Sequence, residues 1–283
     1  MNLPPPLGHR ITTVMGAAPV HANPAGGGCI ANAWEITLSD QRRIFAKTVF
    51  TGSPFPAEAL GLQHLHKANG VRVPHVYHAD PDLLLLEFIP FGQPAADWQE
   101  TLGRQLAQTH RHTDTHYGFD LDHFIGSTPQ KNLPRLPDTP GAWSEFWWTY
   151  RLEPMIRRLP ATHQPAFSTL ESRVRHWTAD TGEAPAILHG DLWSGNAAAD
   201  QNGQPILFDP APYFGHREAD LAMTRMFGGF TEPFYAAYHE AFPLQDGWSD
   251  RLNFYMLYHV LNHIVLFGNS YLPQAQRILA RCK

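Results

Sequence analysis

The chain has 283 residues, of which 43% are hydrophobic and 17% charged, a globular composition long enough for two lobes or two small domains. A formal net charge of −5 provides no basic surface for nucleic acid or anionic lipid, so we expect neither a nucleic-acid nor a membrane partner. Two cysteines, Cys29 and Cys282, exclude a disulfide scaffold, and the first residues lack the features of a signal peptide. We therefore expect a cytoplasmic protein.

The first part of the chain, residues 1–91, is predicted to form a small β-rich lobe. Residues 33–38 alternate in polarity, a turn follows, and residues 44–50 continue with β-branched and aromatic side chains, which is typical of a hairpin. Residues 56–70 have helical periodicity and end in Asn-Gly, a common helix stop. The apolar run 83–89 has the length of a buried strand.

The second part, residues 92–283, is predicted to be mainly helical. Asp97 and Glu100 resemble a capping box at the start of its first helix. A proline-rich loop covers residues 127–140, and a helical tail is expected from about residue 218 to 281.

The decapeptide "ILHGDLWSGN", residues 187–196, carries the strongest chemical signal. Its H-x-D-x-x-x-x-N spacing is that of a kinase catalytic loop, in which the aspartate accepts the proton of the attacking hydroxyl and the asparagine binds magnesium. This predicts Asp191 as the catalytic base and Asn196 as a metal ligand. Asp209 follows the next apolar strand, where a kinase places a second metal-binding carboxylate, and Mg²⁺ prefers oxygen ligands of this kind.

A kinase also needs phosphate-binding residues before its catalytic loop, and the sequence supplies them in order. Gly26, Gly27 and Gly28 precede the first hairpin strand and could cover the phosphates. Lys47 lies on the next strand, and Glu58 opens the following helix, where it could orient the lysine. Each residue alone would be weak evidence, but their joint order favours a kinase.

The chain resembles the fructosamine kinases, a branch of the aminoglycoside-phosphotransferase-like kinases. Besides the residues above, "STPQ" at 127–130 and "GHREADLAMT" at 215–224 carry this resemblance, which covers nearly the whole chain. It implies an α+β, bilobal protein-kinase-like fold with an antiparallel, β-rich N-terminal lobe at residues 1–91, which binds ATP. Residues 92–283 would form a larger, mainly helical lobe for catalysis and substrate binding.

The resemblance also implies ATP and Mg²⁺ as cofactors and assigns further residues by position. The backbone of Glu87, Phe88 and Ile89 would form the adenine-binding hinge, and Asp220 would brace the catalytic loop. Trp193 would contact the sugar or pack the loop. Two further residues are candidates for contact with the acceptor substrate, His189 and Gln130.

The activity implied by the resemblance is phosphorylation of the O3 hydroxyl of a ketosamine, a sugar joined to a small amine or a protein lysine. The enzyme would be a phosphotransferase with an alcohol acceptor that repairs glycated amines. A kinase for another hydroxyl acceptor, such as an aminoglycoside or choline, remains the alternative. A pseudokinase is disfavoured, because Lys47, Asp191, Asn196 and Asp209 are all present.

Two other features bear on this interpretation. Lys131 stands where the family usually has proline, which leaves the rigidity of that loop open. His259, Asn262 and His263 lie in an apolar helical segment and are expected to be satisfied polar groups of the core rather than ligands.

Overall fold

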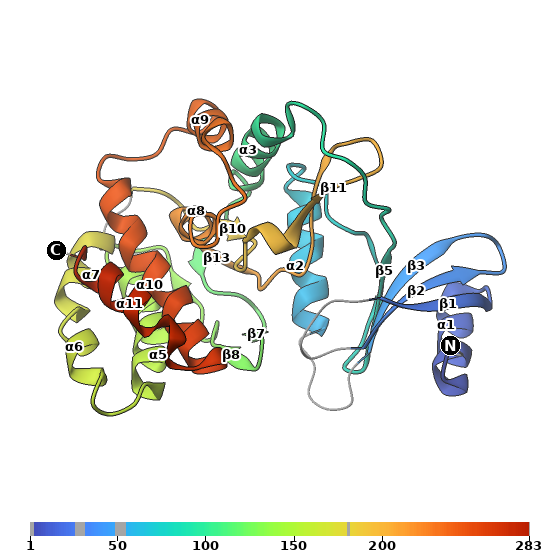
Figure 1. Cartoon of the computed structure of the whole chain (residues 1–283), viewed down its shortest axis with the longest axis horizontal. Helices are drawn as coiled ribbons and strands as arrows, with labels where there is room; N and C mark the ends of the chain where they lie inside the picture. Colours follow the sequence, from blue (N-terminus) through green and yellow to red (C-terminus); the bar gives the residue numbers. More distant parts are fainter. Residues whose placement is uncertain (1–2, 26–31, 49–54, 180–181, 283) are drawn as a thin grey trace.

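The computed structural model describes residues 3–25, 32–48, 55–179 and 182–282 and has two lobes, one built on a sheet and one mainly helical (Figure 1). The small lobe contains α1 (Pro5–Met15), β1 (Pro19–Ala25), β2 (Asn32–Leu38), β3 (Arg43–Thr48), α2 (Phe55–Lys67), β4 (Val76–Ala79) and β5 (Leu83–Glu87). The observed α+β architecture is the one that the sequence predicts. The division between residues 91 and 92 stays a prediction.

The large lobe contains short strands among many helices. In chain order its elements are α3 (Trp98–Thr109), β6 (His116–Tyr117), β7 (His123–Ile125), β8 (Thr128–Gln130), β9 (Leu136–Pro137), α4 (Ala142–Trp147), the π-helical turn η1 (Trp148–Leu152), α5 (Glu153–Arg158), α6 (Gln164–Ser168), α7 (Glu171–Thr178), β10 (Ala186–Leu188), the 3₁₀ turn η2 (Ser194–Asn196), β11 (Ala197–Ala199), β12 (Pro205–Leu207), β13 (Tyr213–Gly215), α8 (Glu218–Thr224), α9 (Glu232–Ala241), α10 (Trp248–Phe267), η3 (Asn269–Tyr271) and α11 (Leu272–Leu279). The strands pair as four two-stranded ladders, β6 with β9, β7 with β8, β10 with β13 and β11 with β12.

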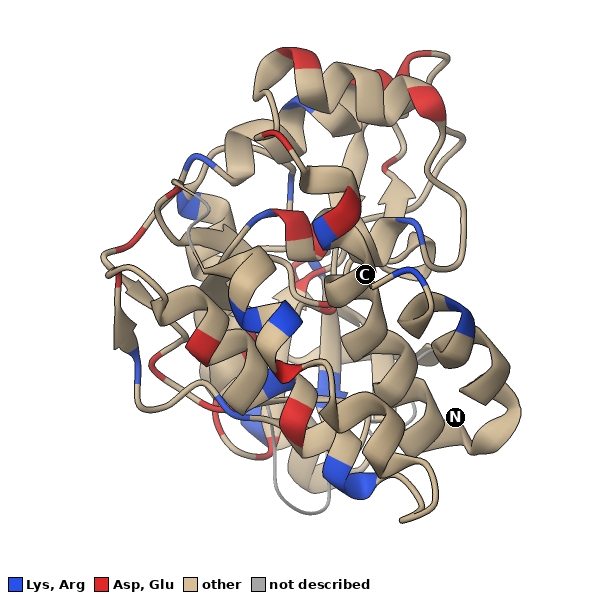
Figure 2. Ribbon diagram, turned by 90° about the vertical axis from the view of Figure 1, so that its left-hand side faces the viewer, with Lys and Arg blue, Asp and Glu red and all other residues tan. Residues whose placement is uncertain are grey.

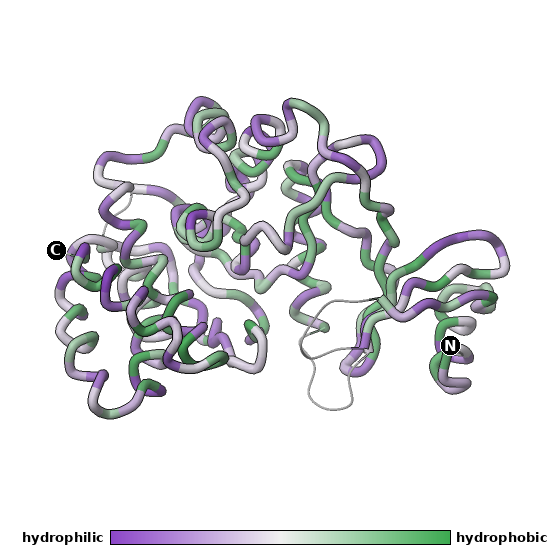
Figure 3. The backbone as a smooth tube through the Cα atoms, viewed as in Figure 1, coloured by the Kyte–Doolittle hydropathy of each residue, from purple (hydrophilic) through white to green (hydrophobic). Residues whose placement is uncertain are grey.

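The sheet of the small lobe has the order β1-β2-β3-β5-β4, with every neighbouring pair antiparallel. Strand β5 is buried on both faces because successive side chains of a strand point to opposite sides. Leu83 and Leu85 pack with Ile11 of α1, whereas Leu84 and Leu86 join the core that continues through α2 into the large lobe. This double burial explains the continuous run of four leucines, which is green in Figure 3.

Helix α1 and strand β1 lie in a stretch where the sequence pattern predicts no regular element. Proline occupies the first positions of α1, where its missing N–H would be unsatisfied in any case, so a proline-rich start is compatible with a helix. Ile11 and Met15 lie one turn apart on its buried face, and Gly16 ends the helix in a left-handed conformation with φ 68°.

The large lobe has an aromatic core in which Trp143, Trp147 and Trp148 are buried. The capping box predicted at Asp97 is wrong: its carboxylate makes no capping hydrogen bond to the backbone and instead accepts one from the Thr101 hydroxyl. Among the described residues, no helix is long and apolar enough to cross a membrane. Charged residues of both signs are interspersed over the elements in Figure 2.

Candidate active site

The peptide between β10 and Asp191 is held by one buried carboxylate, that of Asp220 near the start of α8. Its two oxygens accept hydrogen bonds from the backbone N–H groups of His189 at 2.7 Å and Gly190 at 2.8 Å, and His110 Nε2 lies 3.3 Å away. Burial alone would raise the pKa of Asp220, but His110 and the backbone donors outweigh it and lower the pKa. Asp220 therefore stays ionised where the resemblance expects a brace.

Gly190 permits a close approach between the catalytic loop and the segment after Asp209. Its φ is 80°, and a Cβ at this position would lie 1.9 Å from the carbonyl oxygen of Ala211. The neighbouring His189 carbonyl accepts a hydrogen bond from the N–H of Ala211 at 2.8 Å. A side chain at position 190 would separate these two segments, because it would need both a strained backbone and the space of that carbonyl.

Asp191 and Asn196 lie together at the ends of the catalytic loop. The Asn196 Nδ2 donates to the Asp191 carbonyl oxygen at 2.8 Å and to its Oδ2 at 3.2 Å, which leaves the Asn196 Oδ1 for another partner. Burial is the main reason why the pKa of Asp191 is raised to about 7; the hydrogen bond from Asn196 opposes the rise, and the nearby carboxylates of Asp209 and Asp220 add to it. A carboxylate with such a pKa suits a group that accepts a proton near neutral pH.

Lys47, Glu58 and Asp209 form a second group that joins the two lobes. Lys47 Nζ on β3 lies 2.7 Å from Glu58 Oε1 on α2 and 2.5 Å from Asp209 Oδ1 after β12. Burial alone would lower the pKa of Lys47, but the two carboxylates outweigh it and raise the pKa, so the lysine stays charged. The sequence order of these residues thus becomes a single cluster in space.

Asp209 has an unusual backbone and an accessible side chain. Its φ is 55°, a left-handed conformation that is uncommon outside glycine, and its side chain is 45% exposed. The other members of the cluster, Lys47 and Glu58, are 12% and 6% exposed. Asp209 is therefore the member of this cluster that a ligand can reach most easily.

The donor chemistry of Asn196 and Asp209 fits Mg²⁺. Asn196 offers an amide oxygen and Asp209 a carboxylate, and Mg²⁺ takes one or two such protein ligands with water and substrate phosphates completing its octahedron. Within the described part of the chain, no three His, Cys, Asp or Glu side chains gather as a metal site by themselves.

The expected adenine hinge lies at the end of β5, where the chain leaves the sheet. Glu87 is the last residue of that strand, the Arg43 guanidinium lies 4.1 Å from the centre of the Phe88 ring, and Ile89 is buried. Residues Gly26 to Gly28, expected over the phosphates, lie outside the described residues.

Three side chains were expected on the acceptor side, and their positions differ. Trp193 is 38% exposed and its ring lies 5.9 Å from that of Phe227. His189 is buried, with Nε2 donating to the Phe208 carbonyl and Nδ1 accepting from the Asp191 N–H, so its ring holds the loop instead of facing a substrate. Gln130 is also buried. We therefore carry only Trp193 forward as an acceptor contact.

Gln130 faces α10, where Tyr258 and Asn262 are one turn apart. Burial raises the pKa of Tyr258 to about 12, and the nearby Gln130 amide works against this rise.

The Asn262 amide makes no hydrogen bond within the described structure, so the expectation of a satisfied core asparagine is wrong. His263 agrees with that expectation, because its Nδ1 donates to the His259 carbonyl at 2.7 Å.

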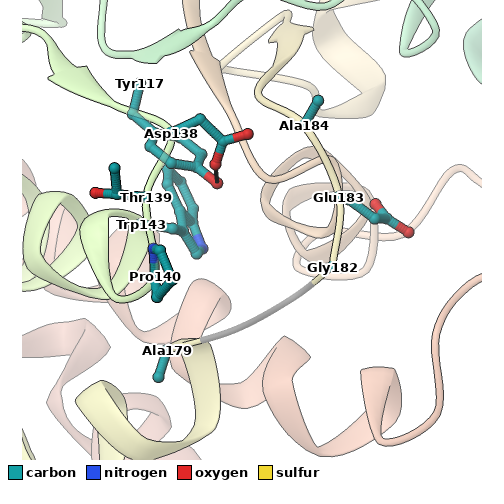
Figure 4. Close-up of a pocket in the computed structure, with 9 residues that line it drawn as sticks. All are labelled: Tyr117, Asp138, Thr139, Pro140, Trp143, Ala179, Gly182, Glu183 and Ala184. Carbon is teal, nitrogen blue, oxygen red and sulfur yellow. Dashed lines mark hydrogen bonds between the residues drawn. The ribbon is translucent and has the colours of Figure 1, made fainter.

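A separate pocket of about 220 Å³ opens on the large lobe. It is shown in Figure 4 and is lined by Tyr117, Asp138, Thr139, Pro140, Trp143, Ala179, Gly182, Glu183 and Ala184. The Tyr117 hydroxyl donates to Asp138 Oδ1 at 3.0 Å. None of the lining residues belongs to the clusters around Lys47 or Asp191, so we do not assign this pocket to the reaction.

The fold and the site together define a class of protein. A β-rich lobe carries a Lys-Glu ion pair, and a helical lobe carries an Asp and an Asn on one loop with a further Asp after the next hairpin. This is the arrangement of a kinase-type phosphotransferase. A solved spectinomycin phosphotransferase in complex with ADP and spectinomycin shares the fold, with a TM-score of 0.61 and 15% identity over 98% of this chain and 90% of that one.

The family model for fructosamine kinase matches residues 9–283, and the chain belongs to this family. It is 37% identical to a probable ketoamine kinase of Synechocystis sp., over 90% of this chain and 88% of the relative. It is 38% identical to the chloroplastic protein-ribulosamine 3-kinase of Oryza sativa subsp. japonica, over 90% of this chain and 76% of the relative. A crystal structure described as a candidate fructosamine-3-kinase from Thermobifida fusca has a TM-score of 0.88 and 30% identity, covering 98% of each chain.

Proposed function

We propose that this protein transfers the γ-phosphate of ATP to the O3 hydroxyl of a ketosamine, with Mg²⁺ as the metal. The observation that carries the proposal is the pair of clusters, in which Lys47 contacts both Glu58 and Asp209 while Asn196 contacts Asp191. The relatives named ketoamine kinase and ribulosamine 3-kinase supply the substrate class.

In this reaction Asp191 accepts a hydrogen bond from the O3 hydroxyl and takes its proton as the new bond from O3 to the γ-phosphorus forms and the bond from that phosphorus to the bridging oxygen of ADP breaks, so that ADP leaves. Lys47, kept charged and oriented by Glu58, contacts the α- and β-phosphates. Bound Mg²⁺ would neutralise charge on the β- and γ-phosphates, and Asn196 and Asp209 are the residues that would hold it. Because the transition state asks little covalent chemistry of the protein, positioning and charge stabilisation supply most of the rate.

The remaining roles follow from position. We place adenine against the backbone of Glu87, Phe88 and Ile89, the phosphates under Gly26 to Gly28, and the sugar near Trp193, whose exposed ring lies two residues from the base. A phosphate on O3 makes the sugar prone to elimination, which frees the amine. The proposed role is therefore repair of glycated amines, on small molecules or on protein lysines, and the cytoplasmic location stays a prediction.

The test is ATP consumption by the purified protein with Mg²⁺ and a panel of acceptors. Ribuloselysine, fructoselysine and erythruloselysine represent ketosamines, whereas kanamycin and choline represent other hydroxyl acceptors. We expect turnover on a ketosamine that disappears in Asp191→Asn and after chelation of the metal. Turnover only on kanamycin or choline would keep the phosphate chemistry and contradict the ketosamine assignment.

A further inference from the structure

Arg72, in the loop between α2 and β4, contacts both lobes. Its Nη2 donates to Glu87 Oε1 at 2.6 Å, and its Nη1 donates to Asp200 Oδ2 at 2.9 Å. Its carbonyl oxygen accepts a hydrogen bond from the Leu207 N–H at 2.9 Å. One residue therefore joins the end of β5 to the hairpin formed by β11 and β12.

The hairpin carries the two expected metal ligands at its open end. Asn196 comes directly before β11, and Asp209 follows two residues after the end of β12. Asp200 closes the other end, because its Oδ1 accepts the N–H groups of Asn202 at 2.8 Å and Gln204 at 3.0 Å. A tilt of this short hairpin would move both ligands together.

The other contact of Arg72 lies on the expected adenine hinge. The Glu87 Oε2 accepts the N–H of His75 at 3.3 Å, so this carboxylate is held from two sides. The linker that follows runs beside the hairpin: Phe91 bridges to Asp200, and the Gly92 N–H donates to the Ala199 carbonyl at 2.9 Å. Figure 1 shows this linker passing close to β11 between β5 and α3.

We infer that Arg72 is a positioning residue that fixes the adenine hinge relative to the hairpin of metal ligands. Its guanidinium suits this task, because its planar fork offers a separate N–H group to each carboxylate in a fixed geometry, whereas a lysine ammonium is a point charge on a flexible stem. The side chain is 44% exposed, and exposed ion pairs contribute little to stability. Its effect should thus appear in nucleotide binding more than in folding. This inference rests on the proposed function, which assigns adenine binding to the hinge and metal binding to the residues at the open end of the hairpin.

The test compares Arg72→Met and Arg72→Lys with the matched control Arg10→Met. Arg10 has similar exposure, 42%, and a single ion pair with Asp80 at 2.6 Å within the small lobe. Titration with ADP and Mg²⁺ measures nucleotide binding without any acceptor, and steady-state kinetics give separate KM values for ATP and acceptor. Thermal unfolding shows whether each variant is folded.

For Arg72→Met we expect a rise of about three- to thirtyfold in the Kd for ADP and in the KM for ATP, with the acceptor KM within about twofold, since lost positioning acts on the nucleotide side. Arg72→Lys should recover only part of the binding, and Arg10→Met should match the wild type. An unchanged Kd in Arg72→Met, or an equal rise in Arg10→Met, would overturn the inference. Because the titration needs no acceptor, absence of ketosamine turnover in the wild type would count against the proposed function alone.

Discussion

Replacing Asp220 by asparagine tests whether one buried carboxylate sets the geometry of the catalytic loop. Its side chain is 1% exposed, and each of its oxygens accepts a backbone N–H from the loop, one from His189 and one from Gly190. An amide of the same shape can present its oxygen to only one of these donors. Asp220→Asn therefore places an NH₂ group against the other N–H.

The magnitude follows from these two contacts. A hydrogen bond to a charged acceptor contributes about 1.5–3 kcal/mol, and a buried donor left without an acceptor costs about 1–3 kcal/mol. Because one bond is lost and the other loses its charge, we expect Asp220→Asn to lower the free energy of unfolding by about 3–5 kcal/mol. A displaced loop should also lower kcat by about 10- to 100-fold, since misplacement by about 1 Å can cost a hundredfold in rate.

The assay is urea unfolding followed by tryptophan fluorescence, with kcat measured where each variant is folded. Asp80→Asn is the matched control, because Asp80 also accepts two backbone N–H groups, from Asp82 at 2.9 Å and Leu83 at 3.0 Å, but lies in the turn before β5 and is 31% exposed. It should lose less stability and keep its kcat. If Asp220→Asn is as stable as the wild type, Asp220 does not brace the catalytic loop. If the variant is destabilised but keeps the full kcat, Asp220 does not position the loop for catalysis.

Three further predictions concern the charged groups. Asp191→Ala or Asp209→Ala should lower turnover by about two to four orders of magnitude in steady-state assays, and near-normal turnover in either would contradict its role. Lys47→Met should raise the KM for ATP and lower kcat. Glu58→Gln should change both constants less, because Asp209 still contacts the lysine at 2.5 Å. Equal changes in the two variants would show that Glu58 is indispensable for placing Lys47. Burial lowers the pKa of His259 to about 3. The folded protein therefore keeps this side chain neutral at pH values where the unfolded chain would protonate it, so the free energy of unfolding falls as the pH drops from about 6.5 to about 3. His259→Gln should therefore reduce the acid loss of unfolding free energy by about 1.36 kcal/mol per pH unit, measured by urea unfolding at several pH values, and an unchanged slope would contradict the burial argument.

The clustering of the candidate site residues could be predicted because their types and spacing match the order that one reaction requires. Lys47, Glu58 and Asp209 come from three segments, yet the order that a kinase requires was enough to connect them, and the structure brings them together. His189 and Gln130 were less well placed, because a motif says which segment lies near the site and not whether a given side chain is buried.

Contacts that depend on tertiary packing could not be predicted in the same way. Nothing local to Arg72 indicates that its guanidinium reaches Glu87 and Asp200, the latter more than a hundred residues away. The capping box at Asp97 failed for a related reason, since an i,i+4 hydroxyl competes for the same carboxylate. Helix α1 was missed because prolines usually mark loops, although they are tolerated in a first helical turn.

The ion pair between Lys47 and Glu58 is already formed in the folded chain without any modification. In protein kinases the Lys-Glu pair depends on the position of a helix that an activation segment controls. Here the pair is 2.7 Å apart in the unmodified chain, and the segment after Asp209 has no comparable freedom. Tyr213–Gly215 pairs with β10, and α8 begins at Glu218, so regular structure resumes soon after Asp209.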